Sequence, residues 1–286
     1  MRGVVATIET PSGYPVPLTW IAGEPGAPVI LLMAALGVGT PFYAGLGAEL
    51  AGQGFQVALM EQRGHGDSRL RPSRRSDWGF ADTLDNDLPA VMDWLRQSAP
   101  GAPLYLMGHS LGGHYAAITA GRFPERIAGV ILVATGTPWW KAFQGETRKM
   151  IHRLVRIIPF ANFAFGYYPG ERIGFGGSEA RTVMRDWRNL ARTNRYSAHG
   201  LAADLDTDIA RYGGPVLAVR LADDVFAPRA AVQAVTGKFK NATLTEQVLT
   251  AEALGDKADH FRWARQASVV TGYVAEWIKA DNRAGS

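Results

Sequence analysis

The sequence predicts an α/β protein with a mostly parallel central sheet and helices on both faces of that sheet. Two observations support this prediction. Short apolar runs alternate with helical patterns along most of the 286 residues, which is typical of parallel strands joined by right-handed crossovers. The run at residues 28–33, Pro-Val-Ile-Leu-Leu-Met, is apolar throughout, as expected for a strand that helices cover on both sides.

The expected elements follow in order along the chain. Residues 4–10 and 16–22 flank a Pro-Ser-Gly-Tyr-Pro turn and predict a hairpin. Residues 43–53 predict a helix that ends at Gly54, and residues 55–61 predict the next strand. Further helices are expected at residues 82–97 and 261–279, and further strands at residues 103–107, 127–134, 215–221 and 242–249.

Residues 137–208 interrupt this alternation, with two helical patterns and no convincing strand. Ser178 fits the N-cap of the second helix, whose apolar face carries Val183, Trp187, Leu190 and Ala191. An aromatic stretch punctuated by Pro and Gly, residues 158–170, is expected between the two helices. We therefore expect a core domain of residues 1–136 and 209–286, with residues 137–208 inserted as a helical cap.

Composition excludes several classes of function. The chain has no cysteine, which excludes disulfides, thiolate catalysis and Cys-ligated metals. No His, Asp or Glu cluster has metal-ligand spacing, so we expect no metal and no other cofactor. The N-terminal stretch lacks the pattern of a secretory signal, and the longest apolar run, at residues 29–38, is about half of a membrane span. We expect a cytoplasmic protein without a membrane span; its oligomeric state stays open.

The net charge is +4, but the cations are concentrated in one region. Between Thr137 and Gly200 there are eleven Lys or Arg residues and four acids. No nucleic-acid-binding motif accompanies these cations, so we expect no nucleic-acid partner. A solvated basic face is the first interpretation of this charge, and attraction of an acidic or acyl-thioester substrate is the second.

The stretch at residues 105–114 contains Gly108-His109-Ser110-Leu111-Gly112, between an apolar strand and a helix rich in small residues. This Gly-x-Ser-x-Gly pattern is typical of a sharp turn that holds a serine in a strained backbone conformation at the top of a sheet. Only glycine at positions 108 and 112 lets the strand and the helix approach closely enough. The alternative is an ordinary serine turn.

A serine hydroxyl needs a base within hydrogen-bond reach, and the base needs an acid to orient it. Asp223 and Asp224 follow the strand at residues 216–221, at the sheet edge that binds ligands in parallel sheets. His260 lies on the loop before the last helix. The order Ser, Asp, His agrees with the fold. Capping of His260 by Asp259 is the structural alternative.

These motifs resemble those of the α/β-hydrolase superfamily over nearly the whole chain. Four segments carry the resemblance: the Gly-x-Ser-x-Gly turn at residues 108–112, which we call the elbow, the turn at residues 62–68, the loop at residues 222–228 and the pair His260-Phe261. It implies the α/β-hydrolase fold, and it selects Asp224, because proline follows the family's catalytic aspartate by four positions. Residues 134–140, 166–170 and 224–228 further resemble a bacterial branch of predicted hydrolases. The resemblance also disfavours haloalkane or epoxide hydrolysis, because family members with those activities rely on an aspartate at the position that Ser110 occupies here.

Many family members carry His-Gly after the first parallel strand, whereas this chain has Ala34-Ala35-Leu36-Gly37. Backbone N–H groups are the donors of an oxyanion hole, so side-chain identity is not required there. We expect the amides of Leu36 and Leu111 to form it. Four aromatic residues of the cap are candidates for substrate contacts: Trp139, Trp140, Tyr167 and Tyr168. The alternative for them, and for Phe143, Phe160, Phe163 and Phe165, is the core of the cap.

The sequence therefore predicts a serine hydrolase that cleaves a small-molecule ester or thioester through an acyl-enzyme. Ser110 attacks the carbonyl, His260 transfers the proton, and Asp224 fixes the imidazole. An acyltransferase with the same triad and a non-catalytic small-molecule binder are the alternatives. The other histidines are expected to be structural or pocket-lining (His65, His109, His114) or solvated (His152, His199).

Overall fold

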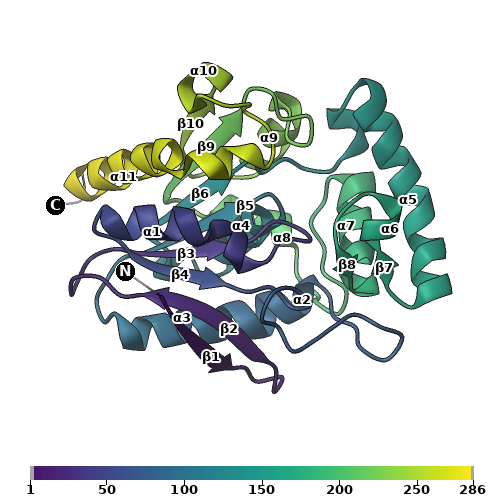
Figure 1. Ribbon diagram of the computed structural model, residues 1–286, viewed down its shortest axis with the longest axis horizontal. Helices are drawn as coiled ribbons and strands as arrows, with labels where there is room; N and C mark the ends of the chain where they lie inside the picture. Colours follow the sequence, from purple (N-terminus) through teal and green to yellow (C-terminus); the bar gives the residue numbers. More distant parts are fainter. Residues whose placement is uncertain (1–2, 285–286) are drawn as a thin grey trace.

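A computed structural model of the chain describes residues 3–284 and contains one large sheet of eight strands in the order β1-β2-β4-β3-β5-β6-β9-β10 (Figure 1). The hairpin strands β1 and β2 are antiparallel, β2 meets β4 antiparallel, and all later pairs are parallel. The predicted mostly parallel sheet is confirmed. The strands are β1 (Val4–Glu9), β2 (Pro15–Ile21), β3 (Val29–Met33), β4 (Gln56–Met60), β5 (Leu104–His109), β6 (Gly129–Val133), β9 (Pro215–Leu221) and β10 (Thr243–Leu249).

Helices cover both faces of this sheet. One face packs on α1 (Ala44–Gly52) and α11 (Ala267–Ala284), and the other packs on α3 (Leu88–Ser98), α4 (Leu111–Arg122), α8 (Leu205–Arg211) and α9 (Arg229–Thr236). Strand β3 serves both cores, since Ile30 and Leu32 point to the first and Leu31 and Met33 to the second. The short helices α8, α9 and α10 (Ala251–Leu254) were not predicted from sequence.

The expected helix at residues 82–97 consists of three consecutive pieces. These are α2 (Phe80–Asp82), a π-helical turn (Thr83–Asp87) and α3. Pro89 stands at the start of α3, where a residue without an N–H is tolerated. In an uninterrupted α-helix the ring of Pro89 would clash with the carbonyl of Asp85, four residues earlier. No described helix is long and apolar enough to cross a lipid bilayer.

The inserted segment, residues 137–208, differs from its prediction in two places. The stretch at residues 158–170 is largely helical, because α5 (Gly145–Phe165) continues through Pro159 to a left-handed Gly166. Pro159 cannot donate to the carbonyl of Val155, and Arg188 Nε donates to that carbonyl instead, at 2.6 Å. This distant side chain explains why the helix does not stop.

Ser178 is not a helix cap, contrary to prediction. It belongs to β8 (Ser178–Glu179), which pairs with β7 (Tyr168–Pro169) in a small sheet that the sequence did not indicate. Helix α6 (Gly170–Ile173) lies between these strands, and α7 (Arg181–Thr193) starts after Ala180. The apolar face expected on this helix is confirmed, since Val183, Trp187, Leu190 and Ala191 are all buried.

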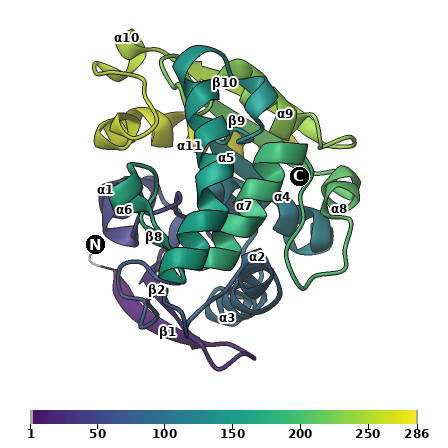
Figure 2. The same cartoon turned by 90° about the vertical axis from the view of Figure 1, so that its right-hand side faces the viewer.

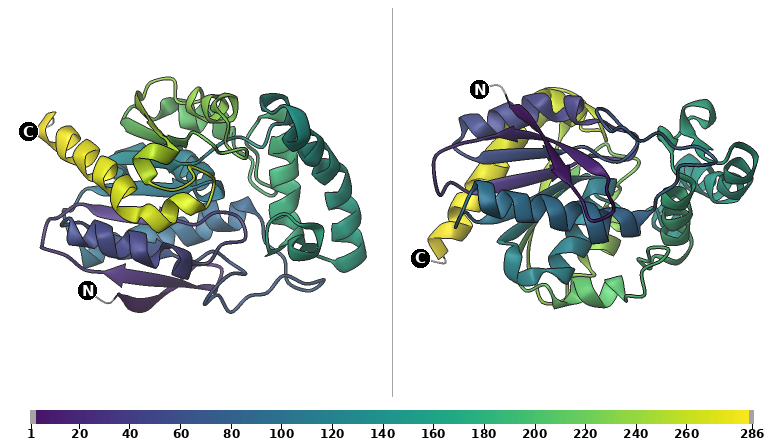
Figure 3. Two further views of the ribbon diagram at one scale, coloured as in Figure 1. Left: turned by 45° about the horizontal axis from the view of Figure 1, so that its top comes forward. Right: turned by 90° about the horizontal axis from the view of Figure 1, so that it is seen from below.

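The inserted segment stands beside the sheet, on the side opposite the end of α11 (Figures 1 and 3). Its final helix, α8, crosses position 208 and packs on α4 so closely that a Cβ at Gly121 would lie 2.4 Å from the backbone of Asp208. Residues 174–177 lie against the turn after β3, since a Cβ at Gly37 would be 2.5 Å from the nitrogen of Gly177. The segment thus contacts the sheet edge through backbone as well as side chains.

One buried ion pair joins the inserted segment to the loop after β4. His65 Nε2 lies 3.0 Å from Glu179 Oε2, and both side chains are at most 10% exposed. The other carboxylate oxygen of Glu179 accepts the N–H of Gly177 at 3.1 Å. The pair therefore holds residues 174–177 in place over the turn after β3.

Burial alone would lower the pKa of His65, but the hydrogen bond and the negative charge of Glu179 outweigh it and raise that pKa. Glu61 acts in the same direction and Arg71 against it. A histidine whose folded pKa is raised contributes its full stability below the usual value of about 6.5. That contribution is lost as the pH rises through the raised pKa.

The substitution Glu179→Gln should therefore lower the free energy of unfolding by about 2 kcal/mol at about pH 5.5, and by clearly less at about pH 8.5. Urea unfolding at the two pH values measures the difference. Glu146→Gln is the matched control, because Glu146 pairs with Lys149 on the exposed surface and should change stability little at either pH. Equal destabilisation by Glu179→Gln at both pH values would contradict this account.

Candidate active site

Ser110 connects β5 to α4 in a conformation that L-residues rarely adopt, with φ +52° and ψ −113°. Such a position costs roughly 1–3 kcal/mol and is held here by neighbouring backbone. The N–H of Ser110 donates to the carbonyl of Val133 at 3.1 Å. A Cβ at Gly108 would lie 2.2 Å from the backbone of Gly112, and one at Gly112 would lie 2.1 Å from the carbonyl oxygen of Met33. Glycine is therefore required at both positions.

The loops after β9 and before α11 bring an acid and a base together. His260 Nδ1 lies 2.7 Å from Asp224 Oδ2, and the Asp224 side chain is fully buried. The second oxygen of Asp224 accepts the N–H groups of Phe226 and Ala227 at 2.8 and 3.0 Å. The carboxylate is thus oriented by its own loop and by the imidazole at the same time.

Asp223, the competing acid, is hydrogen-bonded to Ala258, whereas His260 is hydrogen-bonded to Asp224. The backbone N–H of Asp223 donates to the carbonyl of Ala258 at 2.9 Å, and its Oδ2 accepts the N–H of Ala258 at 3.3 Å. Asp223 therefore fastens the loop that carries His260 to the loop that carries Asp224. Asp259 caps the start of the final helical segment instead, because it accepts the N–H of Phe261 and Arg262.

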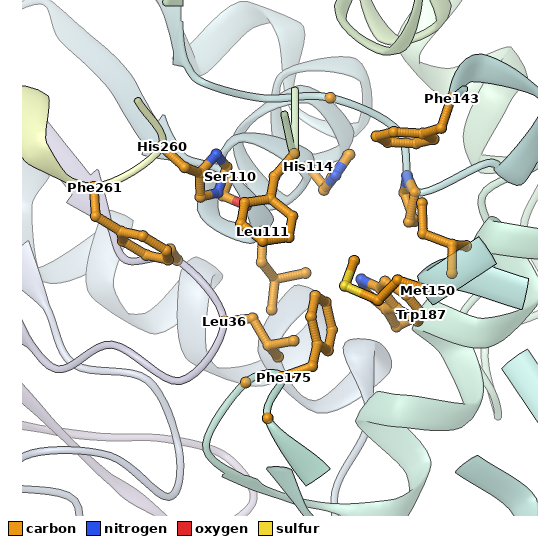
Figure 4. A pocket seen from close by; sticks show the side chains of 17 residues that line it. Leu36, Ser110, Leu111, His114, Phe143, Met150, Phe175, Trp187, His260 and Phe261 are labelled. Atoms are coloured by element: carbon orange, nitrogen blue, oxygen red, sulfur yellow. The ribbon is translucent and has the colours of Figure 1, made fainter. Parts of the chain in front are cut away.

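Ser110 and His260 line one cavity of about 190 Å³, and Figure 4 shows their side chains next to each other in its wall. The sheet side contributes residues that follow β3, β5, β6 and β9, including Leu36, Leu111 and Phe226. The inserted segment covers the opposite side with Phe143, Met150, Ile151, Phe175 and Trp187. The carboxyl ends of the strands and the inserted segment therefore enclose the cavity between them.

The four aromatic residues that the sequence suggested for substrate contacts lie outside this cavity. None of Trp139, Trp140, Tyr167 and Tyr168 lines this cavity. Trp140 stacks against His152, with ring centroids 4.6 Å apart, and Tyr168 is fully buried. The aromatic walls are Phe143, Phe175, Phe226, Phe261 and Trp187. Of these, Trp187 lies on the apolar helix face that the sequence indicated.

The turn after β3 is tied to the elbow through Tyr43, a residue that sequence reasoning missed. The Tyr43 hydroxyl accepts the N–H of Ala35 at 2.9 Å and lies 2.8 Å from Nδ1 of His109, the residue before Ser110. Burial, together with the charge of His260, keeps the pKa of His109 well below its usual value. His109 is thus neutral, and its Nδ1 accepts a hydrogen bond from the Tyr43 hydroxyl. Tyr43 therefore links the turn that contains Leu36 to the turn that contains Ser110.

Leu36 and Leu111 both line the cavity beside Ser110 (Figure 4). Leu111 is the first residue of α4, and Leu36 follows the amide that Tyr43 fixes. Their backbones come from the two segments that the glycine contacts bring together. Leu36 and Leu111 thus share the cavity wall with Ser110, and their role as oxyanion donors stays a prediction.

His114 contributes a further polar group to the cavity wall, one helical turn after Ser110. Burial lowers its pKa to about 4, so it is neutral, and its Nδ1 is hydrogen-bonded to the hydroxyl of Tyr196. Burial raises the pKa of Tyr196 well above its usual value. The phenol therefore donates the hydrogen bond to Nδ1, and the neutral imidazole of His114 carries its own proton on Nε2.

Comparison with known proteins agrees with this architecture. The family model described as serine aminopeptidase, S33, matches residues 27–194. The monoglyceride lipase of Homo sapiens is 31% identical over 111 residues, which are 38% of this chain and 36% of the lipase. Est1E from Butyrivibrio proteoclasticus, solved with ferulic acid bound, has a TM-score of 0.65 at 17% identity and covers 97% of this chain and 99% of its own. The thioesterase domain from the curacin biosynthetic pathway has a TM-score of 0.59 at 17% identity, with coverages of 96% and 99%.

The chain spans about a third to a half of the curated relatives it matches, 36% of the human lipase and 48% of a probable esterase from Oryza sativa. The likeness to the two solved structures shows the fold. The family model extends over more than half of the 286 residues and includes the elbow. The chain therefore belongs to the serine aminopeptidase S33 family, within the α/β-hydrolase superfamily.

Proposed function

We propose that this protein is a serine hydrolase that cleaves a carboxylic ester or thioester through an acyl-enzyme. Ser110 attacks the carbonyl carbon, and His260 Nε2 takes the hydroxyl proton and returns it to the leaving group. Asp224 keeps the proton of the imidazole on Nδ1 and stabilises the cation that forms. Water then attacks the acyl-enzyme with His260 again acting as the base.

The observation that carries this proposal is the 2.7 Å contact between His260 Nδ1 and the fully buried Asp224 carboxylate. It occupies Nδ1 and leaves Nε2 as the ring nitrogen for Ser110, which lines the same cavity as His260. A pure binding protein needs neither a buried acid behind its histidine nor a serine at φ +52°. The strain and the burial are both costs that a catalytic role explains.

The amides of Leu36 and Leu111 are the proposed oxyanion donors. They belong to the turn after β3 and to the N-terminus of α4, whose positive dipole end favours a developing negative charge. Each donor of this type lowers the barrier by about 3 kcal/mol. Tyr43 supports the first of them by holding the neighbouring amide of Ala35.

The cavity favours a neutral substrate with an apolar acyl group. Its walls are mostly leucine, isoleucine, methionine and aromatic side chains, and none of the described residues that line it is Lys or Arg. The cationic surplus of the inserted segment therefore does not supply an anion site beside Ser110. We propose that residues 137–208 act as a cap, whose Phe143, Met150 and Trp187 shape the acyl pocket.

The substitution Asp224→Asn should lower kcat for p-nitrophenyl acetate by about 10⁴-fold, because an amide stabilises the wrong tautomer of His260. Asp223→Asn is the matched control, and it should stay within about tenfold of the wild type, since the asparagine oxygen still accepts the N–H of Ala258. Steady-state kinetics with circular dichroism as a fold check measures both. Comparable losses in the two variants would refute the assignment of the acid.

The substitution Met150→Trp should shorten the acyl chains that the enzyme accepts. Met150 lines the cavity, so a larger ring there should lower kcat/KM for p-nitrophenyl octanoate by about tenfold or more relative to the acetate ester. Glu146→Trp makes a similar change on the exposed surface of the same helix and should leave this ratio unchanged. An unaltered ratio in Met150→Trp would show that the acyl group lies elsewhere.

A further inference from the structure

Two phenylalanines of the inserted segment are among the most exposed apolar side chains of the described residues. Phe160 is 76% exposed and Phe163 is 85% exposed, although the sequence suggested the core of the cap for both. The opposite side of α5 is buried through Ile151, Leu154, Ile158 and Ala161. The helix has satisfied its packing on one side, so the two rings on the other side are free for an external partner.

The exposed side of α5 combines these rings with cations in one helical stripe. Lys149, Arg153, Arg156, Phe160 and Phe163 follow one another at intervals of three or four residues, and all five are exposed, so they share one side of the helix. We call these five residues the outer face of α5. It presents positive charge along its first half and aromatic rings along its second half.

Further cations surround the two rings. Arg74 donates to the carbonyl of Phe163 at 3.3 Å and to that of Ala164, and Arg185 lines a shallow surface groove with Pro159 and Asn162. Two acids near this region are already paired, Glu146 with Lys149 and Asp77 with Arg181. A third, Asp186, interacts with the charge of Arg185. Among the described residues no ion pair is formed by Arg74, Arg153, Arg156 or Arg185. The charge of Arg74, Arg153 and Arg156 is therefore available to an anionic partner.

The shape of this region fits an extended surface better than a partner that has a groove. Figures 1 and 2 show α5 as the outermost helix of the inserted segment, on the side away from the sheet. An outermost helix with exposed phenylalanines near its C-terminal end can place these rings at the boundary between lipid headgroups and acyl chains. The flanking Arg and Lys side chains then lie at the level of the phosphates.

We propose that the outer face of α5 binds the surface of an anionic phospholipid bilayer, without crossing it. The binding is independent of hydrolysis at Ser110 and goes beyond the proposed function. It also has a consequence for that function, because α5 lines the cavity with Met150 and Ile151 on its inner side. A helix that touches lipid with one side and the acyl pocket with the other brings an apolar substrate in the bilayer close to the cavity.

Flotation of the full chain with vesicles tests this proposal. Vesicles of phosphatidylcholine with about 30% phosphatidylglycerol should bind the protein and carry it upward, whereas pure phosphatidylcholine vesicles should bind much less of it. About 0.5 M NaCl should weaken the binding through screening. The double variant Phe160→Ser/Phe163→Ser should bind at least about tenfold more weakly, because two apolar rings no longer enter the interface. Arg153→Gln/Arg156→Gln should lose most of the preference for anionic vesicles.

Two controls separate the outcomes. Val4→Ser/Val5→Ser removes exposed apolar residues of β1 (69% and 58% exposed) and should leave vesicle binding unchanged. Ser110→Ala should also bind like the wild type, so a failure of the proposed hydrolysis would not affect this result. Vesicle binding by the Phe160/Phe163 variant at the wild-type level, or equal binding to both vesicle types, would overturn the proposal. So would a wild-type dimer that the same double variant dissociates, since the face would then pair with a second copy.

Discussion

The backbone of Ser110 is the constraint on which the site depends. A residue at φ +52° and ψ −113° persists only where the surrounding structure determines it. Here β5 and α4 approach at Gly108 and Gly112 until neither position has room for a Cβ, and Gly112 in turn lies on the end of β3. The same close packing that strains the serine also brings the turn of Leu36 beside it. The proposed nucleophile and the proposed oxyanion donors are therefore positioned by one contact.

The remaining loops are positioned by buried polar groups. Tyr43 joins the turn after β3 to His109, Asp223 joins the histidine loop to the acid loop, and Glu179 joins residues 174–177 to His65. Each of these groups satisfies backbone or imidazole atoms that burial would otherwise leave unpaired. The cost of burying these polar groups is offset by the precision with which they position the loops, since a misplacement of about 1 Å at an active site lowers rates by about a hundredfold.

The sequence predicted the sheet because strands buried on both sides must be apolar throughout. It predicted Ser110 from the strand-turn-helix pattern and His260 from its loop before the last helix. A strand end indicated Asp223 or Asp224, and only the family resemblance selected Asp224. Features that depend on distant side chains were not predictable in this way. Helix α5 passes Pro159 because Arg188 serves the carbonyl of Val155, and Tyr43 acts on residues eight and sixty-six positions away. Helical periodicity also identifies an exposed and a buried stripe without saying which aromatic residues face a cavity, so Phe175 was missed and Trp140 was misplaced.

The central claim is that Ser110 is a nucleophile activated by His260. Reaction with a fluorophosphonate probe, followed by mass spectrometry of the intact protein and its peptides, tests this most directly, because the probe reports nucleophilicity without requiring the natural substrate. The account predicts a single adduct on Ser110 in the wild type, and labelling slowed by at least about a hundredfold in His260→Ala. An unlabelled wild type, an adduct on another residue, or labelling of His260→Ala at the wild-type rate would contradict it.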